Sequence, residues 1–272
     1  MAAGTPEEVA ARVAQALAGC PEVEAVALGG SRAAGAADGR SDVDLYVYGE
    51  APPPLGLRAA LAAGSARAEL DNRFFEPGDE WLDAGSGLHL DVMYRTPAWI
   101  EADLDRVLVR HQAWVGYSTC FWDGLRTART LFDRRGWYAG LQARAAAPYP
   151  EPLRRAIVAK NRPLLADNAS SFAAQLEKAV ARGDAVSANH RASAFLASFF
   201  DVLFALNRAT HPGEKRLLQH AAQRCPLRPV GLDAGVAALL GAAASLSRAA
   251  GPSARALAAG LEELLRLERL LA

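Results

Sequence analysis

One stretch, residues 28–47, constrains this chain more than any other. An apolar run ends there in Gly29-Gly30-Ser31. Glycines after a strand let the backbone turn sharply and present its N–H groups to an anion, so we expect a strand, a tight turn and an anion site. The two glycine-rich nucleotide motifs G-x-x-x-x-G-K-[ST] and G-x-G-x-x-G are both absent at this turn. The sequence therefore predicts an anion site of a different kind.

Two aspartates follow the turn. Asp42 and Asp44 open a β-branched and aromatic run that is typical of a strand. Side chains two apart in a strand point to the same face, so these carboxylates would lie roughly 7 Å apart along the backbone. Like charges at that spacing are unfavourable unless cations lie between them. Two Mg²⁺ ions roughly 4 Å apart, held by such a pair, are the arrangement that phosphoryl and nucleotidyl transfer use.

Either feature alone has an ordinary explanation, as a turn or as a solvated strand end, but together they resemble a known signature. Gly29-Gly30-Ser31 followed by Asp42-x-Asp44 looks like the motif of the polymerase-beta-like nucleotidyltransferase superfamily. The chain resembles its two-domain bacterial type, which includes aminoglycoside (streptomycin) adenylyltransferases. The resemblance implies a third carboxylate on a neighbouring strand.

Asp91 fits that third position. It lies in residues 88–94, where apolar side chains alternate onto one face and leave Asp91 on the other. An Asp in an otherwise apolar strand needs a partner, and a metal ion is a suitable one. The alternative is an edge-strand Asp that faces water.

The resemblance implies a Mg²⁺-dependent nucleotidyltransferase that moves a nucleoside monophosphate, AMP from ATP, onto a hydroxyl of a small, aminoglycoside-like molecule. Asp42 and Asp44 would hold two Mg²⁺ ions, and Asp91 would bind one ion or accept the proton of the acceptor hydroxyl. The residues assigned to the nucleotide are Gly29, Gly30, Ser31, Arg32, Ser41 and Lys215.

Lys215 is assigned because of its place in the sequence. It is expected in the first turn of a helix over residues 214–224, where the helix dipole disfavours a cation, so a bound anion would explain it. The resemblance implies the same role, since related adenylyltransferases use a helical-domain lysine. A surface lysine is the alternative. The surrounding stretch, residues 207–216, resembles an uncharacterised bacterial nucleotidyltransferase-like family with a helical C-terminal domain.

An acidic segment, residues 76–83, precedes the Asp91 strand and is expected to be a turn. It could form an acidic wall with an aromatic platform beside the active site, which would suit a cationic acceptor. The residues assigned to the acceptor are Glu76, Asp79, Glu80 and Trp81. A solvated loop is the alternative.

Strand signals stop near Pro97. We expect an α+β chain: a small mixed-sheet nucleotidyltransferase domain over residues 1–96, then an all-α helical bundle over residues 97–272 that holds the acceptor and closes the cleft. Oligomeric state stays open. The helical segments, recognised by apolar residues three and four apart, are 98–110, 119–132, 153–165, 170–182, 185–206, 214–224, 231–247 and 253–271.

Composition excludes several classes of function. Lys+Arg and Asp+Glu both number 30, so no basic field indicates a nucleic-acid partner. No apolar run has membrane-spanning length, and the first residues lack the pattern of a signal peptide. Three widely spaced cysteines are typical of reduced thiols. These features indicate a cytoplasmic protein without a membrane partner.

Three other functions stay open. The acceptor could be a protein side chain, as for antitoxin-type nucleotidyltransferases, or the fold could serve as a non-catalytic nucleotide sensor. Arg106 and His111 also match the Arg-x4-His spacing of a ribonuclease-type toxin, a match short enough to arise by chance.

Overall fold

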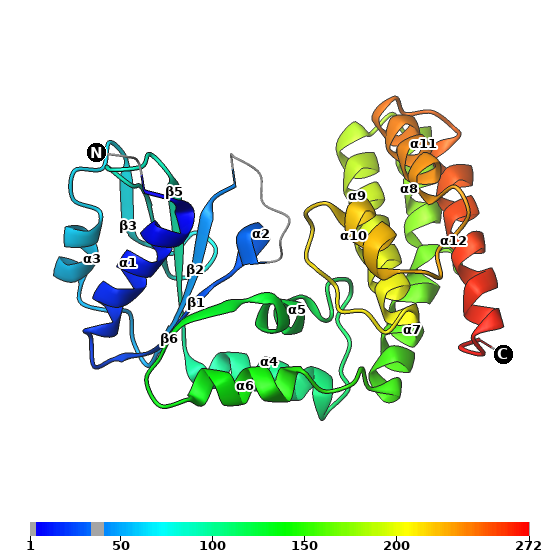
Figure 1. The fold of residues 1–272 in the computed structure, drawn as a ribbon. Helices are drawn as coiled ribbons and strands as arrows, with labels where there is room; N and C mark the ends of the chain where they lie inside the picture. The colour runs from blue at the N-terminus through cyan, green and yellow to red at the C-terminus, as the bar shows by residue number, and fades with distance from the viewer. Residues whose placement is uncertain (1–3, 34–40, 272) are drawn as a thin grey trace. The chain divides into compact units, whose positions relative to one another are not determined.

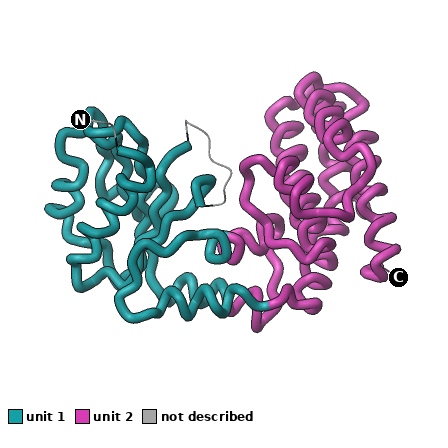
Figure 2. Tube along the Cα trace, viewed as in Figure 1, with its two compact units in different colours: residues 1–104, 124–147 teal, residues 105–123, 148–272 magenta. Residues whose placement is uncertain are grey.

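The protein, as a computed structural model, is described over residues 4–33 and 41–271. It divides into two compact units (Figure 2). Unit 1 contains residues 1–104 and 124–147, and unit 2 contains residues 105–123 and 148–272. Unit 1 is built on a mixed β-sheet and unit 2 on helices, so the predicted α+β class is confirmed. Within the described ranges, no helix is long and apolar enough to cross a membrane.

The sheet of unit 1 has six strands in the order β3-β4-β5-β2-β1-β6 (Figure 1). β2 and β5 run parallel, and the other four neighbouring pairs run antiparallel. The central position of β1 and β2 explains why their core-facing side chains are apolar and fully buried. The strands are β1 (Val23–Leu28), β2 (Val43–Gly49), β3 (Ala68–Asn72), β4 (Gly78–Leu82), β5 (His89–Arg95) and β6 (Arg129–Asp133).

Helices cover the two faces of this sheet differently. One face packs against α1, whose buried Val13 and Leu17 join a core with strand residues such as Leu45 and Val92. On the other face, Tyr48 contacts aromatic rings of α6. The helices up to residue 145 are α1 (Pro6–Ala18), α2 (Gly30–Ala33), α3 (Leu55–Leu61), α4 (Pro97–Leu108), α5 (Cys120–Thr127) and α6 (Trp137–Ala145).

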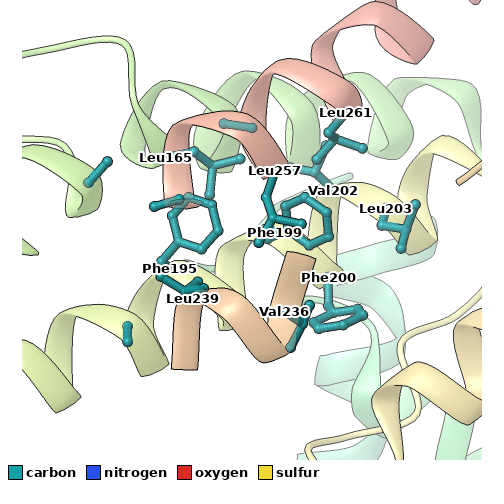
Figure 3. Packing of buried hydrophobic residues seen from close by; sticks show 14 of the residues in the cluster. Leu165, Phe195, Phe199, Phe200, Val202, Leu203, Val236, Leu239, Leu257 and Leu261 are labelled. Carbon is teal, nitrogen blue, oxygen red and sulfur yellow. The ribbon is translucent and has the colours of Figure 1, made fainter. Parts of the chain in front are cut away.

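Unit 2 packs around α9, whose final residues, 198–206, are all buried. A helix segment that is buried on every side belongs inside a bundle, and Phe195 and Phe199 of α9 accordingly lie in one buried cluster with Leu257 of α12 (Figure 3). The remaining helices are α7 (Glu151–Leu165), α8 (Phe172–Ala181), α9 (Ala185–Leu206), α10 (Leu217–Arg224), α11 (Leu232–Ala244) and α12 (Ala250–Leu267).

Residues 119–132 correct the expectation that no strand follows Pro97. They were predicted to be one helix, but α5 ends at Thr127 and β6 begins at Arg129. β6 is an edge strand that is paired on one side with β1, and none of its side chains is fully buried. Without a buried face, it lacks the alternation by which a strand is recognised. Unit 1 therefore takes in residues beyond the single boundary expected at residue 97.

Candidate active site

Three carboxylates from three adjacent strands lie in one row across the sheet. Asp44 of β2 is the register partner of Asp91 of β5, and Asp91 is in turn the partner of Glu80 of β4. Register partners point to the same face of a sheet. Their sequence neighbours Val43 and Leu90 are fully buried in the α1 core, so the row lies on the opposite face.

The glycine turn approaches this row closely. The Gly29 N–H donates to the backbone oxygen of Asp44 at 2.9 Å. Gly30 has a φ of +60°, and a Cβ added there would lie 1.7 Å from Asp44 Oδ2. A Cβ on Gly29 would lie 2.2 Å from the Tyr46 ring. Both positions therefore require glycine, because the backbone touches side chains of β2.

This contact changes what the two glycines can do. The Gly29 N–H is used on Asp44, and the Gly30 backbone forms a hydrogen bond with the Tyr46 hydroxyl. Both glycines thus have contacts that shape the turn, and their assignment to the nucleotide stays a prediction. Ser31 follows in the short helix α2 and is half-buried.

The Arg32 side chain donates hydrogen bonds to backbone oxygens at the start of β2, including that of Ser41. The Arg32 Nε–H donates to the Asp42 backbone oxygen at 2.9 Å, and an Nη donates to that of Ser41. Arg32 thereby holds the start of β2 close to α2. Both contacts use one edge of the guanidinium, that of Nε and Nη2, and the assignment of Arg32 to the phosphates stays a prediction.

His89 lies between two carboxylates, those of Asp42 and Glu80. Its Nδ1 lies 3.3 Å from an oxygen of Asp42, and its Nε2 lies 3.7 Å from one of Glu80. Burial and the neighbouring Asp44 and Glu80 carboxylates raise the pKa of Asp91 to about 6, and His89 partly offsets the rise. Neither His89 nor the register of Glu80 was singled out from sequence, although alternation along 89–91 already puts His89 on the face of Asp91.

Residues 8–112 match the family described as "Nucleotidyltransferase domain". The chain carries a nucleotidyltransferase domain. Residues 124–217 match a second family, "Domain of unknown function (DUF4037)". A nucleotidyltransferase-like protein from Exiguobacterium sibiricum 255-15 is a similar solved structure, with 15% sequence identity over 98% of this chain and 76% of that chain and a TM-score of 0.45. No curated protein matches the chain.

The donor chemistry of the nucleotidyltransferase domain suits a hard dication. Carboxylate oxygens are the ligands that Mg²⁺ prefers, and Asp44 and Asp91 stand side by side in register. Over residues 4–33 and 41–271, however, no three His, Cys, Asp or Glu side chains already converge as a metal site requires. Asp42 instead faces His89. The carboxylates of Asp44 and Asp91 are of the right chemical type for Mg²⁺ and lie on the same face of the sheet. The ligands would have to move closer together to bind the ion.

The predicted acidic wall needs correction, because residues 78–82 are strand β4 and not a turn. Asp79 is fully buried on the core side, where it accepts hydrogen bonds from Arg58 (2.8 Å) and from the Tyr94 hydroxyl (2.6 Å). Trp81 is buried on that side too. Since neighbours on a strand point to opposite faces, Glu80 alone of the residues assigned within β4 reaches the carboxylate row.

Glu76 precedes β4 and is engaged within unit 1. Both of its carboxylate oxygens accept hydrogen bonds from Arg95, at 2.7 and 2.8 Å. A bidentate pair of this kind is a structural clamp, so Glu76 is not a free acidic group for an acceptor.

Lys215 belongs to unit 2 and is exposed. It lies in the turn before α10, which begins at Leu217 after Arg216 adopts a left-handed backbone. Lys215 is therefore not in a first helical turn, and the dipole argument for an anion beside it no longer applies. Its assignment to the nucleotide stays a prediction.

Proposed function

We propose that this chain is a Mg²⁺-dependent nucleotidyltransferase that moves AMP from ATP onto a hydroxyl of a small molecule. The observation that carries the proposal is the register of Asp44 with Asp91 directly beneath a turn that only glycine can form. A nucleotidyltransferase domain with carboxylates in one row on the face opposite α1 has the donors for this reaction.

In the proposed reaction, the acceptor oxygen attacks the α-phosphorus of ATP. The bond from that phosphorus to the bridging oxygen breaks, and pyrophosphate leaves. Asp42 and Asp44 would hold Mg²⁺, and a carboxylate oxygen of Asp91 would bind an ion or take the acceptor proton. Bound dications would supply neutralisation of the phosphate charges. α2 begins at Gly30 beside Asp44, and the Ser31 backbone and hydroxyl that follow are proposed to hold a phosphate.

The acceptor is proposed to be cationic and of the aminoglycoside type. Glu80 supports this, because its half-exposed carboxylate extends the row on the side of Asp91 away from Asp44. Glu69 of β3 is the register partner of Glu80 and continues the acidic line, although Arg67 pairs with it at 2.8 Å. A positively charged acceptor would find complementary charge along this edge.

The test is incubation with labelled ATP and Mg²⁺, together with a panel of aminoglycosides, lincosamides and cell lysate. Label on a small molecule is the expected result. Label on a protein band would instead identify an antitoxin-type protein AMP-transferase, and ATP binding without transfer would identify a sensor. Either of these two outcomes overturns the proposal.

Asp42→Asn and Asp44→Asn should abolish transfer and leave the fold intact, because an amide keeps the shape but loses the charge that holds a dication. Mg²⁺ with ATP should raise the Tm of the wild type and raise it far less in either variant. Asp71→Asn is the matched control. Asp71 lies on β3 of the same sheet with a φ of 55°, a backbone conformation that Asn tolerates well. Wild-type transfer in both site variants would refute the metal assignment.

A further inference from the structure

Tyr46 contacts both glycines of the turn but belongs to none of the groups assigned above. It lies two residues after Asp44 on β2 and hence on the same face of the sheet. Its ring occupies the space that a Cβ on Gly29 would need, and its hydroxyl bonds to the backbone of Gly30. Burial raises the pKa of Tyr46 to about 12, so this hydroxyl stays neutral at physiological pH.

Arg95 holds the Tyr46 ring from beneath. Its guanidinium carbon lies 4.3 Å from the centre of that ring and 5.2 Å from the ring centre of Trp99. Glu76 fixes the same guanidinium by the two hydrogen bonds described above, and the Arg95 side chain is only 9% exposed. A desolvated cation over an aromatic face, with a bidentate carboxylate, has little freedom to move.

These contacts form a continuous stack from Glu76 through Arg95 and Tyr46 to the glycine turn. Glu76 and Arg95 lie toward the far end of the sheet from Asp42, since Arg95 pairs in register with Tyr48 near the end of β2. The stack therefore supports the turn from the side away from the open carboxylates. Nothing in it needs to touch a substrate.

We propose that Tyr46, held by Arg95 and Glu76, is a positioning residue that sets the distance of the Gly29-Gly30 turn from Asp44, and so the place of the nucleotide phosphates. The inference rests on the proposed nucleotidyl transfer. The aromatic ring is a rigid spacer, and a shift of about 1 Å in a group that orients a substrate can cost about 100-fold in rate.

Three substitutions test the stack by steps. Tyr46→Phe keeps the ring and loses the hydrogen bond to Gly30, so kcat/KM for the nucleotide should fall by about tenfold, as for one lost hydrogen bond. Tyr46→Leu removes the spacer and should cost about 100-fold. Arg95→Lys keeps the charge but loses the planar guanidinium that Glu76 binds. Its loss of kcat/KM for the nucleotide should lie between those of the two Tyr46 variants. The acceptor KM should stay at its wild-type value in all three variants.

Tyr94→Phe is the matched control. It removes a buried tyrosine hydroxyl from the adjacent strand, but on the core face, where that hydroxyl binds Asp79 at 2.6 Å. We expect it to lower the Tm with no change in the nucleotide KM. Equal kinetic losses in Tyr46→Phe and Tyr94→Phe, in proportion to lost stability, would mean that Tyr46 is only a core residue, and would overturn the inference.

Amide hydrogen exchange separates this inference from the proposed function. Exchange at residues 29–33 should quicken in Tyr46→Phe and more so in Tyr46→Leu, but not in Tyr94→Phe. This readout needs no catalysis. If the wild type transfers nothing, the proposed function fails while the exchange series still decides whether Tyr46 holds the turn. Unchanged exchange in both Tyr46 variants overturns the inference even if the wild type is active.

Discussion

At the scale of single residues, the sequence predicted Asp42 and Asp44 on one face of a strand, and the resemblance implied Asp91 on a neighbouring strand. The structure sets Asp44 and Asp91 in register. The importance of Gly29 and Gly30 was also predictable, but the reason was not. Both glycines contact side chains of the next strand, β2. The number of residues between the turn and β2 does not show how closely the two approach each other in space. Local pattern shows that glycine is needed, whereas only the packed sheet shows that Asp44 and Tyr46 require it.

Gly30→Ala is the sharpest single-residue prediction. Its methyl group would lie 1.7 Å from Asp44 Oδ2 in a backbone with a φ of +60°, so the turn or the Asp44 carboxylate must move away from the other. We expect kcat/KM to fall by about 100-fold or more. The left-handed backbone should also lower the free energy of unfolding by about 1–3 kcal/mol, measured by urea denaturation.

Gly140→Ala provides the comparison, because Gly140 lies on the exposed side of α6 and an added Cβ meets nothing within 4 Å. Alanine there should raise the free energy of unfolding by about 0.5–1 kcal/mol and leave transfer unchanged. Wild-type kcat/KM in Gly30→Ala would show that the turn does not place the nucleotide.

At the scale of elements, α9 was predicted with the bounds that the structure has, because its 22 residues keep a helical apolar pattern throughout. β4 was missed for the opposite reason. Its five residues begin at Gly78 within the acidic segment 76–83, where Pro77-Gly78 is a strong turn signal. Asp79 is buried only because Arg58 and Tyr94 come from other elements to bind it, which local composition cannot show.

Asp79 and Glu80 lie on opposite faces of β4, so neutralising one should affect stability and neutralising the other should affect acceptor binding. Asp79→Asn breaks a buried ion pair with Arg58, whose side chain is 6% exposed, and should cost about 3–5 kcal/mol of unfolding free energy. Glu80→Gln changes a half-exposed side chain, so stability should move by less than about 0.5 kcal/mol. For a cationic acceptor, the acceptor KM of Glu80→Gln should rise by about twofold to fivefold, and by less at high salt.

Urea denaturation and acceptor KM, measured on the same two proteins, check both halves of this prediction. Asp79→Asn should keep the wild-type acceptor KM wherever it remains folded. A raised acceptor KM in Asp79→Asn, or a large loss of stability in Glu80→Gln, would contradict the alternation that the register of β4 with β5 requires.

At the scale of the whole molecule, the chain leaves and re-enters unit 1 before it completes unit 2. A single boundary at residue 97 was the natural reading, because the helical spacing of residues 119–132 hides the passage from α5 into β6. Backbone pairing of β6 with β1 joins residues more than 100 positions apart, such as Ala25 and Asp133. Pairing over that separation leaves no local sign, so sequence predicted the two kinds of architecture better than the division between them.

The stability of the whole chain should depend on pH through His211 in unit 2. This side chain is fully buried between the rings of Tyr117 and Phe204, and its Nδ1 accepts the Gly213 N–H at 3.1 Å. Burial, with a smaller effect of the nearby His220, lowers its pKa to about 3. His211 therefore stays neutral in the folded protein where an unfolded chain would bind a proton.

The sign of the effect follows from proton binding. Between the unfolded pKa of about 6.5 and the folded pKa, the unfolded state holds the extra proton, so the His211 contribution is complete above pH 6.5 and declines as pH falls toward 3. The slope should reach about 1.4 kcal/mol per pH unit for this one site. Urea denaturation at intervals from pH 7.5 to 4.5 measures this slope.

His211→Asn offers an amide oxygen to the Gly213 N–H but cannot titrate, so its curve of unfolding free energy against pH should be flatter. His190→Asn, on the exposed side of α9, should follow the wild type. Parallel curves for wild type and His211→Asn would show that this imidazole is not held neutral by its burial.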